Sequence, residues 1–298
     1  MKSFVKKFFS IFAVMLMAIC CFSFTACADI KKIEVNFSVY NFVEEELEER
    51  TFTIKLYRHL APKTVDSIIE NVANKSYYNG VTAYILSNIE REDTSEGYAS
   101  QIMLGDLIFD VEKQTYVQNP ISVDFVDGEF EANGVKGSDL KNIVGSVGLW
   151  RTKSVNETYT NNKSANTGKA TMYMPTETLS SRNGYFCVFG TFDTSKESVS
   201  DSWDLIRTSM NISEYRTNYV VYYTGEYNAD DSVLNNGLTF NCVTETEYNQ
   251  MSASEKEKIF KPEGEEYACY FPSTIRASFY EENGVKKPAV TIKSITVK

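Results

Sequence analysis

Alternating apolar and polar residues indicate short strands along much of the chain. Residues 33–40 and 52–57 alternate as half-buried strands do. The acidic run 44–50 lies between them, and we expect it at a solvated hairpin tip or edge. Residues 288–297 alternate again and predict a final strand. These patterns predict a mainly β protein.

Two stretches follow a helical period instead. Apolar residues between 62 and 72 recur at helical spacing, and Pro62 suits a first helical turn. Tyr77-Tyr78-Asn79-Gly80 then ends the helix with a turn. A second helix is predicted over 202–210, where apolar residues again recur.

The first 27 residues read as a targeting segment. Three lysines precede an apolar run over 8–22, and Phe24-Thr25-Ala26-Cys27 resembles a bacterial lipobox, whose cysteine is lipidated. The alternative is an uncleaved membrane helix over 8–26. Both interpretations place the remainder on the extracytoplasmic face of the cell membrane. We favour the lipoprotein, anchored in the lipid bilayer through Cys27.

Charge and cysteine content limit the possible partners and cofactors. The net charge of −10 argues against nucleic acid, because phosphate binding needs a surplus of Lys and Arg. Cys187, Cys242 and Cys269 follow the anchor, and Cys242 with Cys269 is the favoured disulfide pair. The chain has no CxxC motif or Cys/His cluster, so we expect no metal site and no cofactor.

Several motifs occur in the order found in cyclophilins. Residues 52–82 resemble that family's first strand, first helix and Tyr-Tyr-Asp-Gly turn, and 101–106 falls where it carries Met-x-Gln-Gly-Gly-Asp. Further matched segments are 121–125, 145–150, 166–174, 185–190 and 288–297. The resemblance implies that residues 33–298 form a cyclophilin-like closed antiparallel β-barrel with two flanking helices.

Residues 211–287 do not fit that pattern and are too long for a plain connection. We predict an inserted subdomain packed on the barrel. It has strand-like runs at 219–223 and 238–243 and a helix-like polar stretch at 244–260. Its tyrosines either form a binding face or fill a small satellite core, and we favour the core.

Prolyl isomerisation requires a hydrogen-bond donor rather than covalent chemistry. The barrier, about 20 kcal/mol, comes from the partial double bond of the peptide. In the family that the chain resembles, an arginine aims a donor at the prolyl nitrogen and a glutamine helps place the carbonyl group. The corresponding positions here are Ile85 and Met103, so both groups are missing.

The remaining groove positions implied by the resemblance have also changed. Trp150 occupies the position of a small alanine, and Arg182 that of a leucine of the proline pocket. Phe186 occupies the position of a histidine. Thr171 and Tyr173 align with the first and third residues of a Gln-Phe-Phe triplet. Arg182 or Arg151 could point inward and replace the missing cation. We favour the alternative, a solvated surface arginine, for both.

Three functions remain open. The resemblance implies a membrane-tethered protein of the peptidyl-prolyl isomerase and protein-folding family, with weak or absent activity because its catalytic site is degenerate. The second is a non-catalytic module of the cell envelope that binds proline-containing peptides or secreted proteins. The third is a purely structural envelope protein. On the residues alone, the substitutions at Ile85, Met103 and Trp150 favour the second.

Overall fold

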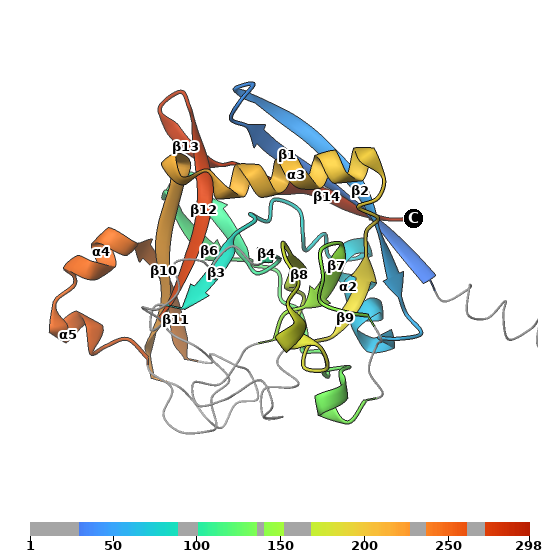
Figure 1. Cartoon of the computed structure of the whole chain (residues 1–298). Coiled ribbons are helices and arrows are strands. Elements are labelled where there is room, and N and C mark those ends of the chain that lie inside the picture. Colours follow the sequence, from blue (N-terminus) through green and yellow to red (C-terminus); the bar gives the residue numbers. More distant parts are fainter. Residues whose placement is uncertain (1–29, 89–100, 136–139, 152–167, 227–236, 261–271) are drawn as a thin grey trace, which may run out of the picture.

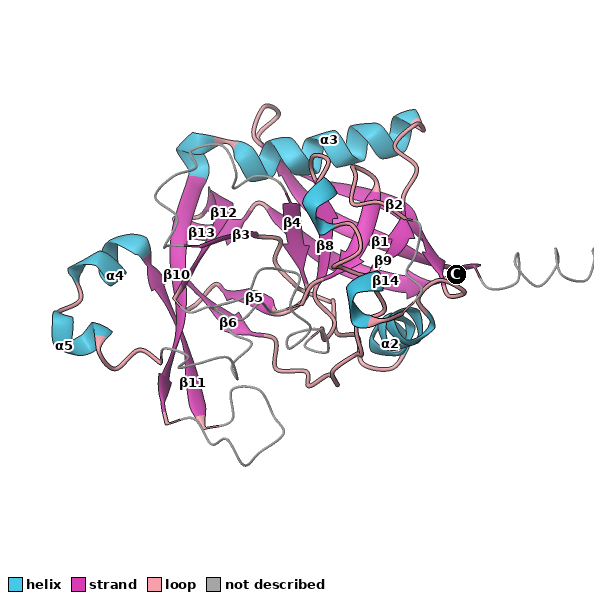
Figure 2. Ribbon diagram, turned by 60° about the horizontal axis from the view of Figure 1, so that its bottom comes forward, coloured by secondary structure: helices cyan, strands magenta, loops and turns pink. Residues whose placement is uncertain are grey.

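The computed structural model describes residues 30–88, 101–135, 140–151, 168–226, 237–260 and 272–298. Strands dominate these residues, as expected from the alternating pattern (Figures 1 and 2). The targeting segment with Cys27, and also Cys269, lie outside the described residues.

The main sheet has seven strands, and every neighbouring pair is antiparallel. In spatial order the strands are β14 (Val290–Val297), β1 (Ile30–Asn41), β2 (Glu46–Tyr57), β9 (Val188–Thr191), β7 (Ser146–Leu149), β8 (Met172–Pro175) and β4 (Gln101–Leu104). The strands predicted at 33–40, 52–57 and 288–297 are thus present.

Residues 80–84 join the two outer strands of this sheet. On one side, the Ala83 N–H donates to the Val290 carbonyl oxygen of β14 (3.0 Å). On the other side, Tyr84 and Met103 of β4 exchange backbone hydrogen bonds of 3.2 and 2.8 Å. Both contacts are antiparallel. The sheet is therefore a strongly curled antiparallel half-barrel, and residues 80–84 bridge its two outer strands.

The β1–β2 hairpin shows why the alternating pattern folds this way. Ile33, Val35, Phe37 and Val39 are all buried in the core, while the residues between them lie on the outer face. The chain turns at 42–45, so most of the acidic run belongs to β2 near the tip.

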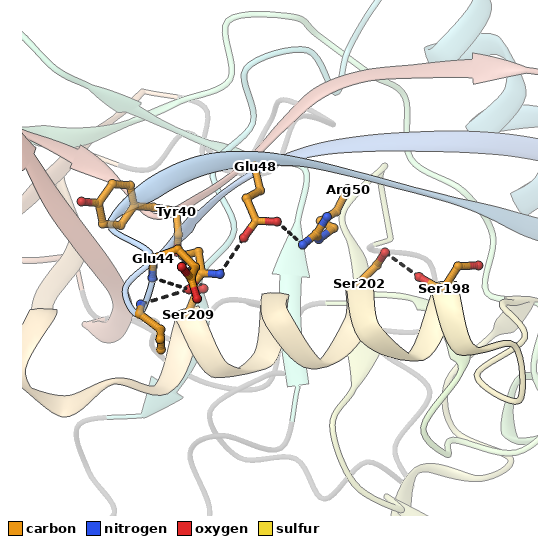
Figure 3. Close-up of polar contacts among 9 residues, drawn as sticks. Tyr40, Glu44, Glu48, Arg50, Ser198, Ser202 and Ser209 are labelled. Carbon is orange, nitrogen blue, oxygen red and sulfur yellow. Dashed lines mark hydrogen bonds and ion pairs between the residues drawn. The ribbon is translucent and has the colours of Figure 1, made fainter.

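Side-chain contacts fix the end of this hairpin (Figure 3). The Glu48 carboxylate accepts hydrogen bonds from Asn41 (2.6 Å) and from Arg50. The Ser209 hydroxyl of helix α3 (Glu197–Asn211) donates to the carbonyl oxygen of Tyr40 (2.9 Å). Helix α3, predicted at 202–210, is thereby attached to the barrel.

Helix α2 (Pro62–Ala73) is capped by a residue from another part of the chain. Its N-cap, Ala61, has no side chain that could accept a hydrogen bond. The buried Glu129 carboxylate instead accepts the backbone N–H groups of Lys63 (2.9 Å) and Thr64 (2.8 Å). A carboxylate at this helix end also interacts favourably with the helix dipole.

A second sheet contains most of the 211–287 segment. Its strands are β11 (Leu238–Thr244), β10 (Arg216–Gly225), β12 (Ser273–Glu282) and β13 (Val285–Pro288), with β3 (Ile85–Asn88) paired to β12. The helix-like stretch forms α4 (Glu245–Gln250) and α5 (Ala253–Lys256).

A separate hairpin pairs β5 (Leu107–Asp110) with β6 (Thr115–Gln118). Three 3-10 helices are η2 (Glu131–Asn133), η3 (Ser180–Arg182) and η4 (Ser213–Tyr215).

The tyrosines of β10 are core residues, as we favoured, and do not form an exposed binding face. Tyr219 is buried in the main core against the rings of Tyr116 and Phe279. Tyr222 belongs to a small second core with Val220 and Ile259. The two faces of β10 therefore bury against different parts of the protein.

Residues 121–125, which the resemblance matches to a strand of the cyclophilin family, do not form the strand that this match implies. These residues belong to no strand, and the nearest pairing is an isolated bridge at Val126. The preceding Pro120 has no N–H for a ladder. The Asn119 side chain also accepts the backbone N–H of Ile121 (3.1 Å) and donates to the carbonyl oxygen of Tyr77 (2.7 Å). These local bonds replace strand pairing.

Replacing Glu129 with Ala should lower the free energy of unfolding by about 1–2 kcal/mol, because two helix N–H groups lose their acceptor. Urea denaturation would measure the change. Glu70→Ala, on the exposed side of the same helix, is the control and should change stability by less than about 0.5 kcal/mol. Equal effects of the two variants would show that Glu129 does not stabilise α2.

Candidate functional site

Three aromatic rings from separate strands meet at one place. Trp150 follows β7, Tyr173 lies in β8 and Phe186 precedes β9. The ring centroids are 5.6 Å apart for Trp150 and Phe186, 5.7 Å for Tyr173 and Phe186, and 6.2 Å for Trp150 and Tyr173. We call these three residues the ring cluster. The structure thus brings together three of the groove positions implied by the sequence.

Arg182, at the end of η3, points into the ring cluster. Its guanidinium carbon lies 5.4 Å from the ring centroid of Trp150, 5.3 Å from that of Tyr173 and 5.2 Å from that of Phe186. The guanidinium also donates a hydrogen bond to the buried Gln101 side chain. Arg182 is thus partly exposed, and cation–π contacts hold its guanidinium over the rings, so it is not the freely solvated arginine that we favoured.

Arg151 is not a surface residue. Only 3% of it is exposed, and its guanidinium carbon lies 4.8 Å from the Phe130 centroid and 5.2 Å from the Phe186 centroid. Phe186 therefore contacts two arginines. The expectation of a solvated side chain fails here because aromatic neighbours cover this guanidinium.

Tyr173 is fixed by a chain of buried contacts. Its hydroxyl donates to the Asn142 side-chain oxygen, and the Asn142 amide donates to Asn183 (3.1 Å), next to Arg182. Its ring lies on Gly148, where an added Cβ would come within 2.3 Å of the ring. These contacts link the position of the Tyr173 ring to the turn that carries Arg182.

Ile85 and Met103 are fully buried and take no part in the ring cluster's ring contacts. Ile85 begins β3 and pairs with Arg276 of β12, whereas Met103 pairs with Tyr84 and Tyr173. The position to which the sequence resemblance assigns the catalytic arginine is thus fully buried in a strand of the second sheet. It offers neither a donor nor access to solvent.

Thr171 faces a different polar group, the buried Asp106. Its side chain hydrogen-bonds this carboxyl, which also accepts the Tyr84 hydroxyl (2.5 Å). Burial raises the pKa of Asp106, and the hydrogen bonds from Tyr84, the Asp106 backbone and Thr171 oppose that rise. Thr171 contacts the ring cluster through its backbone: its carbonyl oxygen accepts the backbone N–H of Trp150 (2.8 Å).

Sequence reasoning missed Gln101 and Asn142. Gln101 opens the segment matched to Met-x-Gln-Gly-Gly-Asp, and a polar residue in place of the methionine was a signal for it. Asn142 gave no signal, because it meets Tyr173 only in the folded chain. Both residues bond to the ring cluster or its arginine.

The described residues contain no group of three or more His, Cys, Asp or Glu side chains that could hold a metal ion. Cys187 is buried and Cys242 is partly buried, and neither forms a disulfide with another described residue. Burial raises the pKa of the Cys187 thiol to about 12, which makes it unreactive at neutral pH. The predicted Cys242–Cys269 pair involves a residue outside the described ones.

The chain is similar in structure to a cyclophilin-type peptidyl-prolyl cis-trans isomerase from Cryptosporidium parvum, with 13% identity and a TM-score of 0.39 over 62% of this chain and 88% of that one. A second structure of a C. parvum enzyme of this type, in the presence of the dipeptide Ala-Pro, gives 14% identity and a TM-score of 0.33 over 56% and 83%. No family model and no curated protein matches the chain. The likeness assigns no activity to it.

Replacing Ile85 with Arg should destabilise the protein by about 3–5 kcal/mol, because it places an unpaired charge in a fully buried site. Ile85→Leu is the control and should cost less than about 1.5 kcal/mol. Chemical denaturation measures both. An Ile85→Arg variant as stable as the wild type would mean that this position can open to solvent.

Asp106→Asn should change how stability depends on pH. Since the folded-state pKa of Asp106 is raised, the stability from this carboxyl is present below its unfolded pKa of about 3.9 and is lost as pH rises through the folded value. The melting temperature of the wild type should therefore fall relative to that of the variant between about pH 4 and pH 7. A constant difference across this range would contradict the raised pKa.

Proposed function

We propose that this chain is a cyclophilin-like lipoprotein of the cell envelope that binds peptide segments of secreted proteins without isomerising their prolyl bonds. The observation that carries this proposal is the complete burial of the Ile85 side chain in β3, which pairs with β12. A donor has to reach the prolyl nitrogen as its lone pair localises, and such a donor contributes a few kcal/mol of transition-state stabilisation. An isoleucine side chain has none.

Peptide binding is supported by the residues at the groove positions that the resemblance implies. They differ from those of the family, yet they are residue types that bind proteins. Trp150 and Arg182 are partly exposed beside buried Tyr173 and Phe186. Aromatic and arginine side chains are those most enriched where proteins bind other proteins. The site thus keeps features of a binding surface after the loss of the residues that the resemblance links to catalysis.

The proposed tether agrees with the geometry of the N-terminal strand. β1 begins at Ile30, so the lipidated Cys27 would lie within about 11 Å of the barrel. The backbone N–H of Lys298 donates to the carbonyl oxygen of Lys32 at this same end (3.0 Å). The tip of the β1–β2 hairpin is about 40 Å away along the strand.

Within the residues described, no helix combines the length and the apolar character needed to cross a membrane. The proposed attachment depends on Cys27 and the segment before it.

A second candidate function is a feeble isomerase in which Arg182 replaces the missing arginine. The observation in its favour is that the Arg182 guanidinium lies among the ring cluster, where the resemblance places the proline pocket. The same observation also counts against it, since the guanidinium occupies the space that a proline ring would need.

A prolyl isomerisation assay on the full chain in detergent separates these functions. We expect no acceleration over the uncatalysed rate of a proline-containing tetrapeptide, with an active cyclophilin as the positive control. Arg182→Leu should leave this result unchanged. Turnover by the wild type that disappears in Arg182→Leu would overturn the binding proposal and establish the second candidate.

A further inference from the structure

The guanidinium of Arg182 is held in position, yet most of its donors are unused. An arginine has five N–H groups. Within the described residues, this one donates a single hydrogen bond, to Gln101. The three rings fix the guanidinium through cation–π contacts and leave donors free for a ligand.

Arg182 differs from Arg50, Arg58 and Arg207 in its charge environment. Arg50, Arg58 and Arg207 each form an ion pair with a carboxylate. Among the described residues, none forms an ion pair with Arg182. Glu131 approaches Gly184, two positions along the chain, without pairing with Arg182.

The surroundings of Arg182 strengthen its attraction for an anion. Aromatic side chains displace water around the guanidinium, and charge interactions are stronger in such a medium than in water. Arg151 places a second positive charge at the Phe186 ring, 5.2 Å from its centroid. The planar arginine fork matches the two oxygens of a carboxylate.

We propose that Arg182 binds a carboxylate of the peptide held at the ring cluster, an inference that rests on the proposed peptide-binding function. The carboxylate belongs either to an Asp or Glu side chain or to a free C-terminus. The partly exposed Trp150 provides an apolar surface for the residue next to it. The ligand is thus an acidic peptide segment, although the chain itself carries a net charge of −10.

Fluorescence anisotropy with the full chain in detergent tests this proposal. Three labelled proline-containing peptides of equal length are compared: one with an internal Glu and an amidated end, one with a free C-terminus, and one neutral and amidated. We expect at least one carboxylate peptide to bind about tenfold tighter than the neutral one. Whichever carboxylate peptide binds identifies the source of the anion.

The variants separate the arginine's charge from its geometry. Arg182→Leu should remove the preference for the carboxylate peptide, and Arg182→Lys should restore only part of it, because lysine lacks the planar fork. Arg207→Leu removes one positive charge from a partly exposed, ion-paired position of α3 and should leave binding unchanged. Circular dichroism checks the folding of each variant, and the salt dependence of wild-type binding gives a readout that needs no variant.

Two outcomes would overturn the inference, and they differ in what they say about the proposed function. Equal binding of all three peptides, unaffected by Arg182→Leu and by salt, would leave peptide binding in place and remove the carboxylate. Failure of every peptide to bind would overturn the proposed function and the inference together.

Discussion

The structure depends on one segment, residues 80–88, which belongs to both sheets. Its first half bonds to β14 and β4, the two outer strands of the main sheet. Its second half is β3, which pairs with β12 of the second sheet. Thr82 also accepts the backbone N–H of Phe109 in the β5–β6 hairpin (3.1 Å). Because these backbone groups are all committed, a change in one sheet must be accommodated by the other.

This shared segment explains the loss of the expected catalytic position. Ile85 lies at the point where the chain leaves the barrel contacts and enters the second sheet. A fully buried residue at this point has to be apolar, because an unpaired charge there would cost several kcal/mol. The pairing of β3 with β12 and the isoleucine at position 85 therefore go together, because a buried residue in this strand cannot be an unpaired arginine.

The sequence predicted those parts of the fold that depend on local patterns. Residues 33–40 could be assigned because their apolar positions alternate, and residues 62–72 because theirs follow a helical period. The pairing of β3 with β12 joins residues far apart in sequence, and no local pattern records it. The strand at 121–125 failed because Asn119 and Pro120 impose a local conformation that outweighs a motif match.

For the candidate site, too, the sequence indicated which residues to consider but not where the fold places their side chains. The sequence identified Trp150, Tyr173, Arg182 and Phe186 as groove positions, but composition favours surface locations for arginines. Arg182 and Arg151 depart from that tendency because aromatic rings lie against both guanidinium groups in the fold. Replacing a leucine of an apolar pocket by an arginine on a ring cluster substitutes a cation for apolar surface. Under the proposed function, this arrangement would select peptide ligands by charge and by aromatic contact.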